Sequence, residues 1–146
     1  MFVDPIKAGL AWRFSVVLDG LPAPLLFSGC SGLDAEYEAF EWKEGGNNAG
    51  VLRLPGPLSY TNVRLTRPVD KDSTVLREWF CRQALMPTRG HAVIELYDGN
   101  GDPVTVWRLS GAWPVKYAGP TMAANGESGE TVAVESLELS HQGFAL

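Results

Sequence analysis

Residues 91–109 read HAVIELYDGNGDPVTVWRL, and this stretch decides the fold. Two apolar runs, 91–97 and 104–109, flank the cluster DGNGDP, whose residue types are those that tight turns require. The pattern predicts a β-hairpin. Because 16 glycines and 10 prolines divide the rest of the chain into similarly short runs, we expect a mainly β protein.

Further strands are expected over 13–18, 25–28, 33–42, 51–54, 62–67, 113–117 and 132–140. The run 33–42 alternates, with apolar side chains on one face and the acidic Asp34, Glu36 and Glu38 on the other. This alternation predicts a half-buried strand, and the break in phase at Phe40 and Trp42 indicates a bulge or the strand's end. On the strand 62–67, the polar face consists of Asn62, Arg64 and Thr66.

A helical period runs over about 73–85, where Val75, Leu76, Trp79 and Phe80 recur at three- and four-residue spacing. Asp72 or Ser73 can cap its start, and Cys81 is expected on its apolar side. Trp79 and Phe80 are interpreted as core anchors that seat the helix on a sheet. The predicted fold is therefore two packed antiparallel sheets, sandwich- or barrel-like, with one flanking α-helix, in a single domain spanning 1–146.

The composition supports a domain with a real core and excludes several classes of function. The chain has 146 residues, 45% of them hydrophobic, and a net charge of −5. That charge disfavours nonspecific nucleic-acid binding. Charged residues and a proline interrupt residues 1–12, so we expect neither a signal peptide nor insertion into a membrane.

Catalytic and metal-binding patterns are weak. His91 and His141 fall in different strands, and Cys30 and Cys81 are interpreted as reduced, buried thiols. We expect no enzyme, no metal and no cofactor. The five tryptophans could stack on sugars in a small carbohydrate- or ligand-binding β-sandwich, which is the alternative function, but anchors in the core and at interfaces are favoured.

The stretch 44–60 differs from its surroundings because glycine, asparagine and proline dominate it. A connection of this length inside a small domain is typically functional or disordered. Its tip is rich in glycine, whereas the aliphatic Leu52 and Leu54 at its base indicate that it packs against something.

Several segments, in order, resemble the tail tube protein family of contractile phages and extracellular contractile injection systems. The C-terminal segment VESLELSHQGF (134–144) and the segment AWPVKY (112–117) are the most telling. One departure is Gln142, where the family has a glutamate. The remaining segments are FSGCSGL (27–33), WKEGGN (42–47), LPG (54–56), YTNVRLTR (60–67) and the helix with Trp79.

This resemblance implies a structural protein of two packed sheets that forms hexameric rings, which stack into a tube inside a contractile sheath. The implied partners are other copies of the chain, sheath subunits, baseplate and tube-cap proteins, and a cargo in the lumen, either a protein effector or DNA. A baseplate-proximal ring that starts the tube is equally compatible. Synthesis in the bacterial cytoplasm and a final place in a phage or injection particle are expected.

Two sets of residues are candidates for assembly. A stacking or inter-subunit loop is expected at Glu44, Gly45, Gly46, Asn47, Asn48, Leu52 and Leu54. Candidates for the lumen wall are Asp34, Glu36, Glu38, Asn62, Arg64 and Thr66, with an outer solvated face as the alternative. A negative wall would repel DNA and let it slide.

Overall fold

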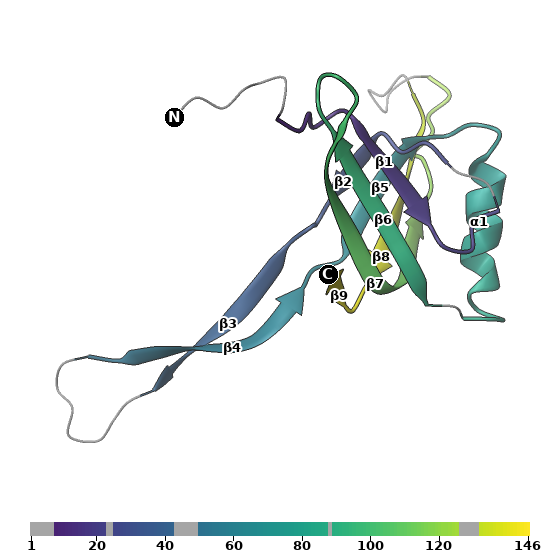
Figure 1. Ribbon diagram of the computed structural model, residues 1–146. Coiled ribbons are helices and arrows are strands. Elements are labelled where there is room, and N and C mark those ends of the chain that lie inside the picture. Colours follow the sequence, from purple (N-terminus) through teal and green to yellow (C-terminus); the bar gives the residue numbers. More distant parts are fainter. Residues whose placement is uncertain (1–7, 23–24, 43–49, 88, 126–131) are drawn as a thin grey trace.

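The computed structural model describes residues 8–22, 25–42, 50–87, 89–125 and 132–146 (Figure 1). This part of the chain is mainly β with one helix, which confirms the predicted class. Its elements are β1 (Phe14–Leu18), β2 (Gly29–Ser31), β3 (Ala35–Trp42), β4 (Leu52–Tyr60), β5 (Val63–Pro68), α1 (Ser73–Arg82), β6 (Gly90–Tyr97), β7 (Pro103–Ala118), β8 (Val134–Ser140) and β9 (Gly143–Ala145).

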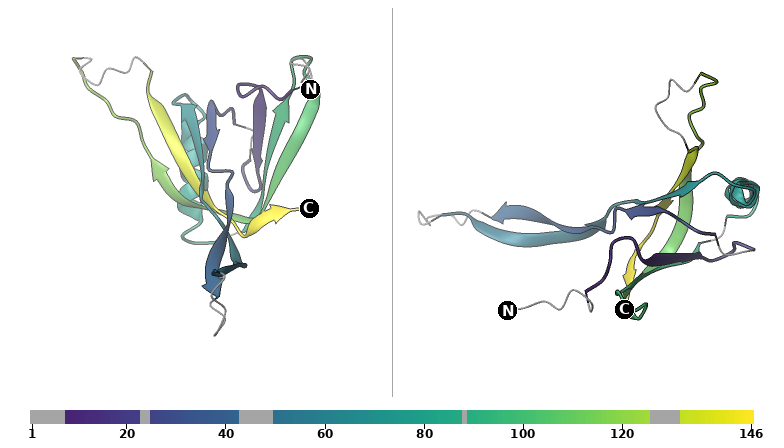
Figure 2. Two further views of the ribbon diagram at one scale, coloured as in Figure 1. Left: turned by 90° about the vertical axis from the view of Figure 1, so that its left-hand side faces the viewer. Right: turned by 90° about the horizontal axis from the view of Figure 1, so that it is seen from above.

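Seven strands form one antiparallel sheet in the order β1-β6-β7-β8-β5-β2, and β9 also pairs with β7. The first part of β7 pairs with β6 and β9, whereas its last residues pair with β8. Near the change of partner, Gly111 has a φ of +59°, a value that favours glycine. The two halves diverge like a V in Figure 2, so the predicted two layers are halves of one sheet that share β7.

The hydrophobic core lies between these two halves and is closed by the helix. Both halves of the sheet and α1 contribute fully buried aliphatic side chains, and Trp79 is 7% exposed, as expected for a core anchor. The principal core residues are Val16, Leu18, Ala92, Ile94 and Leu109 from one half, Val63, Leu65, Leu137 and Leu139 from the other, and Leu76 and Trp79 from α1.

The helix is shorter than predicted, because turns replace the helical backbone after Arg82. Asp72 occupies the N-cap position but its side chain makes no capping hydrogen bond. The hydroxyl of Ser73 accepts a hydrogen bond from the backbone N–H of Asp70 instead, at 3.0 Å. The prediction that Cys81 is buried was wrong: its thiol is exposed, because it lies off the stripe that carries Leu76 and Trp79.

The largest difference from the sequence prediction is a two-stranded arm, β3 and β4, that projects away from the main sheet (Figures 1 and 2). The strand predicted over 33–42 is present as β3, but its predicted half-burial was wrong, since every residue of β3 is exposed. The strand predicted over 51–54 is longer in the structure, because β4 continues through Pro55, Gly56 and Pro57 to Tyr60. In a two-stranded sheet one edge of each strand is unpaired, so a proline that lacks an N–H removes no ladder bond when it faces outward.

Smaller differences concern strand ends. The second strand covers Gly29–Ser31 and not the expected 25–28, and the piece expected at 113–117 is the end of β7. The C-terminus adds the short strand β9, which sequence reasoning did not predict.

Candidate assembly surfaces

The pairing register divides the arm into two faces. Tyr37 pairs with Leu58 and Ala39 with Pro55, so β4 carries an additional residue between these rungs, which is the bulge. Beyond it, Phe40 pairs with Leu54, and the next rungs outward are Glu41 with Arg53 and Trp42 with Leu52. Since side chains alternate between faces along a strand, the apolar rungs share one face and the charged rung lies on the other.

The outer, apolar rungs form a surface that we call the arm patch: Phe40, Trp42, Leu52 and Leu54. Three of its side chains are strongly exposed, with Phe40 at 47%, Trp42 at 54% and Leu52 at 52%. Contiguous exposed apolar residues of this kind mark interaction sites. The arm patch is therefore a candidate contact with another molecule.

The root of the arm joins it to the β2–β5 ladder. That ladder ends at the pair Ser31–Arg64, and the arm ladder begins at Ala35–Tyr60. Between them Gly32 has a φ of +88°, and a Cβ there would lie 2.2 Å from the carbonyl oxygen of Asn62. Glycine is required at this crossing both for the backbone conformation and for the close approach of the two segments.

A second candidate surface is the polar face of β5, β8 and β7, the face directed away from Leu65, Leu137 and the rest of the core. Arg64 pairs with Glu138, and Glu138 pairs in turn with Lys116, so charges of alternating sign cross the sheet. Opposite charges on neighbouring strands favour the pairing. This face can line an aqueous space without a strong charge of one sign.

The structure separates the residues that sequence reasoning grouped as lumen candidates. Glu36 and Glu38 lie on the exposed arm and Asp34 at its root, whereas Arg64 and Thr66 lie on β5 in the main sheet. Asn62 is exposed in the turn between β4 and β5. Of the predicted stacking residues, Leu52 and Leu54 belong to the arm patch, and Glu44, Gly45, Gly46, Asn47 and Asn48 lie outside the described residues.

A buried polar network fastens α1 to the sheet. The Arg67 guanidinium, 2% exposed, donates to Glu135 at 2.6 Å, to Ser73 at 3.0 Å and to both carboxylate oxygens of Asp70 at 2.9 and 3.0 Å. Tyr117 donates to the second oxygen of Glu135. Sequence reasoning missed this network. The sequence pattern that could have indicated it is a pair of charged residues, Arg67 and Glu135, at strand positions that alternation places on the core side.

Burial and hydrogen bonding shift the pKa values of this network. Burial alone would lower the pKa of Arg67, but the hydrogen bonds to Asp70 and Glu135 outweigh it and the pKa rises. The hydrogen bond from Arg67 lowers the pKa of Asp70. Burial, with the hydrogen bond to Glu135, raises the pKa of Tyr117 to about 12. These shifts favour the charged forms of Arg67 and Asp70 and the protonated form of Tyr117, which are the forms that make the hydrogen bonds of the network.

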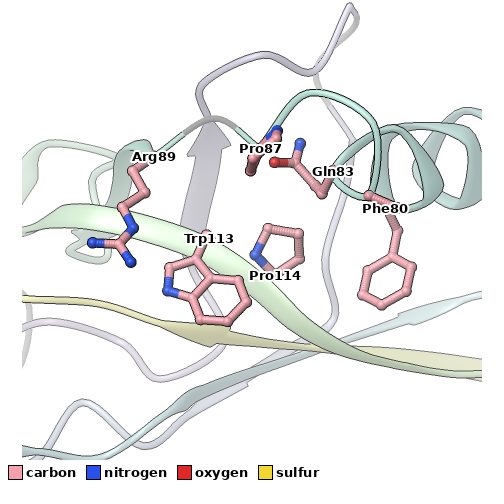
Figure 3. Close-up of a pocket in the computed structure, with 7 residues that line it drawn as sticks. Phe80, Gln83, Pro87, Arg89, Trp113 and Pro114 are labelled. Carbon is pink, nitrogen blue, oxygen red and sulfur yellow. The ribbon is translucent and has the colours of Figure 1, made fainter.

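A groove of about 360 Å³ lies where the end of α1 meets β7 (Figure 3). Phe80 and Pro87 on the helix side face Trp113 and Pro114 of β7, and Arg89 lies at one end of the groove. The lining is chiefly apolar, and the groove contains no cluster of acid, base and nucleophile. Within the described part of the chain, no set of three or more His, Cys, Asp or Glu side chains is placed to hold a metal ion.

Comparison with known families identifies the class of protein. The family model for the T4-like virus tail tube protein gp19 matches residues 10–145, nearly the whole chain. The chain belongs to this tail tube family. The matched region contains the main sheet, the helix and the arm, so the two candidate surfaces are parts of the family domain.

Solved structures of similar fold agree with the family. A chain in the baseplate of the anti-feeding prophage is 28% identical with a TM-score of 0.77, and 94% of each chain is covered. A chain in the sheath-tube complex of the extracellular contractile injection system PVC is 24% identical with a TM-score of 0.79, covering 94% of this chain and 90% of that one. Hcp1 from Flavobacterium johnsoniae is 14% identical with a TM-score of 0.50, covering 88% and 89%. No curated protein is significantly similar to the chain.

These findings confirm the predicted role as a structural, tail-tube-type protein and give the ligand-binding β-sandwich no support. The tryptophans fit this result. Trp79 and Trp107 pack in or against the core, whereas Trp12, Trp42 and Trp113 are 72%, 54% and 37% exposed. No helix of the described residues has the length and apolar character needed to cross a bilayer.

Proposed function

We propose that this chain forms hexameric rings that stack into the hollow inner tube of a contractile phage tail or injection device, in a purely structural role. Family membership over residues 10–145 supports a tube subunit. The observation that carries the stacking role is the arm, whose exposed apolar patch has no partner surface in its own chain among the described residues.

The arm suits a contact between rings. Its strands pair only with each other, so its length and both outer edges are available to a neighbouring subunit. A two-stranded hairpin alone is marginally stable in water, and burying an apolar face against a partner stabilises it. The predicted stacking residues Glu44, Gly45, Gly46, Asn47 and Asn48 lie between β3 and β4 in the sequence and belong to this proposal.

The stacking role is tested by electron microscopy of the purified chain over a concentration series, with light scattering on the same samples. In the variant Trp42→Ser/Leu52→Ser the apolar rung of the arm patch is polar, and we expect rings without tubes. The matched control Glu41→Ser/Arg53→Ser changes the neighbouring rung on the opposite face and should form tubes like the wild type. Normal tubes from the first variant would contradict the stacking role, and so would loss of tubes in both variants.

Several partners follow from the proposed place in the particle. Sheath subunits lie outside the tube, and baseplate and tube-cap proteins lie at its ends, as the similar chains from sheath-tube, baseplate and cap structures suggest. The chain builds either the main tube or the ring that starts it at the baseplate. After synthesis in the bacterial cytoplasm it becomes part of the assembled particle. Adding a cognate baseplate complex distinguishes the two: a starting ring forms rings only with the baseplate.

The polar face of β5, β8 and β7 is proposed to line the lumen, with Arg64 and Thr66 among its residues and a protein effector or DNA as cargo. Asp34, Glu36 and Glu38 instead accompany the arm toward the ring-ring contact. In a tube reconstruction, added side-chain density from Arg64→Trp should lie in the channel, and that from Glu36→Trp should lie between rings. Density from Arg64→Trp on the outer wall would refute this assignment.

A further inference from the structure

The direction of the arm depends on few contacts. At the root, Thr61 donates from its hydroxyl to the carbonyl of Gly32 at 2.9 Å, and its backbone N–H reaches the carbonyl of Asp34 at 3.4 Å. The ladders on either side of the root are interrupted between Ser31 and Ala35. Because the root is short and the arm is long, the arm needs further contacts with the main sheet to keep one direction.

Three aromatic side chains supply that support at the point where β4 ends. The Tyr60 ring packs edge-on against Phe144, with centroids 5.0 Å apart, and tilted against His141 at 5.3 Å. His141 and Phe144 are stacked with centroids 6.0 Å apart. We call this cluster of Tyr60, His141 and Phe144 the arm joint, because it links the last residue of the arm to the turn between β8 and β9.

Backbone chemistry determines how His141 acts in the joint. The N–H of Gly143 donates to Nδ1 of His141 at 3.1 Å, so this nitrogen carries no proton. The proton of the neutral ring is therefore on Nε2, which lies 3.1 Å from the carbonyl oxygen of Thr61 and donates to it. The ring is 9% exposed, and it connects the C-terminal turn directly to the backbone of the root.

The turn that carries His141 is itself anchored to the main sheet. The N–H of Gln142 donates to the carbonyl of Ser110 on β7 at 2.8 Å, and the Ser110 hydroxyl donates to the carbonyl of Gly143 at 3.2 Å. Gly143 has a φ of +133°, and a Cβ there would lie 2.8 Å from the Tyr60 ring. The arm joint is thus closely packed and connects the arm to β7.

We propose that the arm joint fixes the direction of the arm relative to the main sheet, and that Tyr60 and His141 are positioning residues for ring stacking. The second half rests on the proposed stacking role. An arm held in its bound direction loses little conformational freedom when it meets a neighbouring ring, whereas a swinging arm must be ordered first and binds more weakly.

The direction of the arm can be measured without assembly. Pulsed electron paramagnetic resonance would measure the distance between a spin label at Glu41→Cys on the arm and one at the native Cys81 on α1, with labelled chains diluted into unlabelled ones. Cys81 is exposed, whereas burial raises the pKa of Cys30 to about 11 and protects it from labelling. Tyr60→Ala removes the ring of the joint, and the matched control Tyr60→Phe keeps it.

We expect one narrow distance distribution in the wild type and in Tyr60→Phe, and a broad one in Tyr60→Ala. A narrow, unshifted distribution in Tyr60→Ala would overturn the joint. His141→Ala, which removes both hydrogen bonds, should broaden the distribution as well, and it replaces Tyr60→Ala as the test if that variant does not fold by circular dichroism.

Tube formation tests the second half. The concentration at which tubes appear should rise about tenfold or more in Tyr60→Ala and stay unchanged in Tyr60→Phe, because only the former must order its arm on binding. A broadened distribution with tubes at the wild-type concentration would refute the positioning role. Failure of the wild type to form tubes would count against the proposed function, while the distance measurement would still decide the joint.

Discussion

Replacing Glu135 by alanine tests the account of the buried network. The Glu135 side chain is fully buried and accepts from Arg67 at 2.6 Å and from Tyr117. Its removal leaves a guanidinium that is 2% exposed with one charged partner, Asp70, and a tyrosine hydroxyl without its acceptor. The perturbation therefore uncovers a buried charge at the place where β5, β8 and α1 meet.

Removing one partner of a buried ion pair costs about 3–5 kcal/mol. Because Asp70 still binds the guanidinium through both oxygens, we expect the lower end for Glu135→Ala, about 3 kcal/mol. At this chain length each kcal/mol shifts the melting temperature by about 2–4 °C, so a decrease of about 6–12 °C follows. The double variant Arg67→Met/Glu135→Leu removes both charges and should lie within about 1 kcal/mol of the wild type.

The assay is urea unfolding followed by tryptophan fluorescence and circular dichroism, with all variants at one protein concentration because self-association would add apparent stability. A loss below about 1 kcal/mol in Glu135→Ala would refute the reasoning. So would a double variant less stable than the single one, because the cost would then belong to packing and not to the uncovered charge.

Three further outcomes follow. The hydrogen bond from Arg67 lowers the pKa of Asp70 in the folded chain. The ionised Asp70 carboxylate therefore contributes stability above its ordinary pKa of 3.8, and this contribution should be lost as the pH falls through the lowered folded pKa. The urea midpoint should accordingly decline less between pH 6 and pH 2 in Asp70→Asn than in the wild type. Cys81 should react with a thiol reagent at pH 8 in the folded chain, and Cys30 should react only after unfolding, because burial raises its pKa to about 11. Gly32→Ala should destabilise the chain by about 1–3 kcal/mol in urea unfolding, because its Cβ would meet the carbonyl of Asn62 and its φ is positive.

The sequence predicted those elements whose burial is decided within the chain. The hairpin around 98–102 follows from local turn chemistry, and the Asp98 carboxylate indeed accepts from the N–H groups of Asn100 and Asp102 at 2.9 Å. The helix followed from the helical spacing of Val75, Leu76, Trp79 and Phe80, and Trp79 is buried as expected. In these places, residue type and spacing suffice because the partner surface is the same domain's core.

The arm could not be predicted in the same way. Alternation along 33–42 shows that one face of a strand favours contact, but it does not show whether the contact lies in the same chain or in another. The prolines of β4 suggested a loop, although an arm with free edges accepts them. The arm joint escaped as well, because Tyr60 and His141 lie 81 residues apart by number and meet only through the pairing of β5 with β8.

The same reasoning explains why so much apolar surface is concentrated on the arm. An exposed hairpin with free edges and aromatic side chains is an aggregation hazard for a protein that stays single. In a closed, stacked assembly, each subunit presents the same surface to a neighbour with defined geometry. The exposed apolar hairpin then forms an inter-subunit contact instead of causing aggregation. The arm patch selects one partner surface over random association only if the arm points in one direction before contact. An arm joint anchored on β7 supplies this fixed direction.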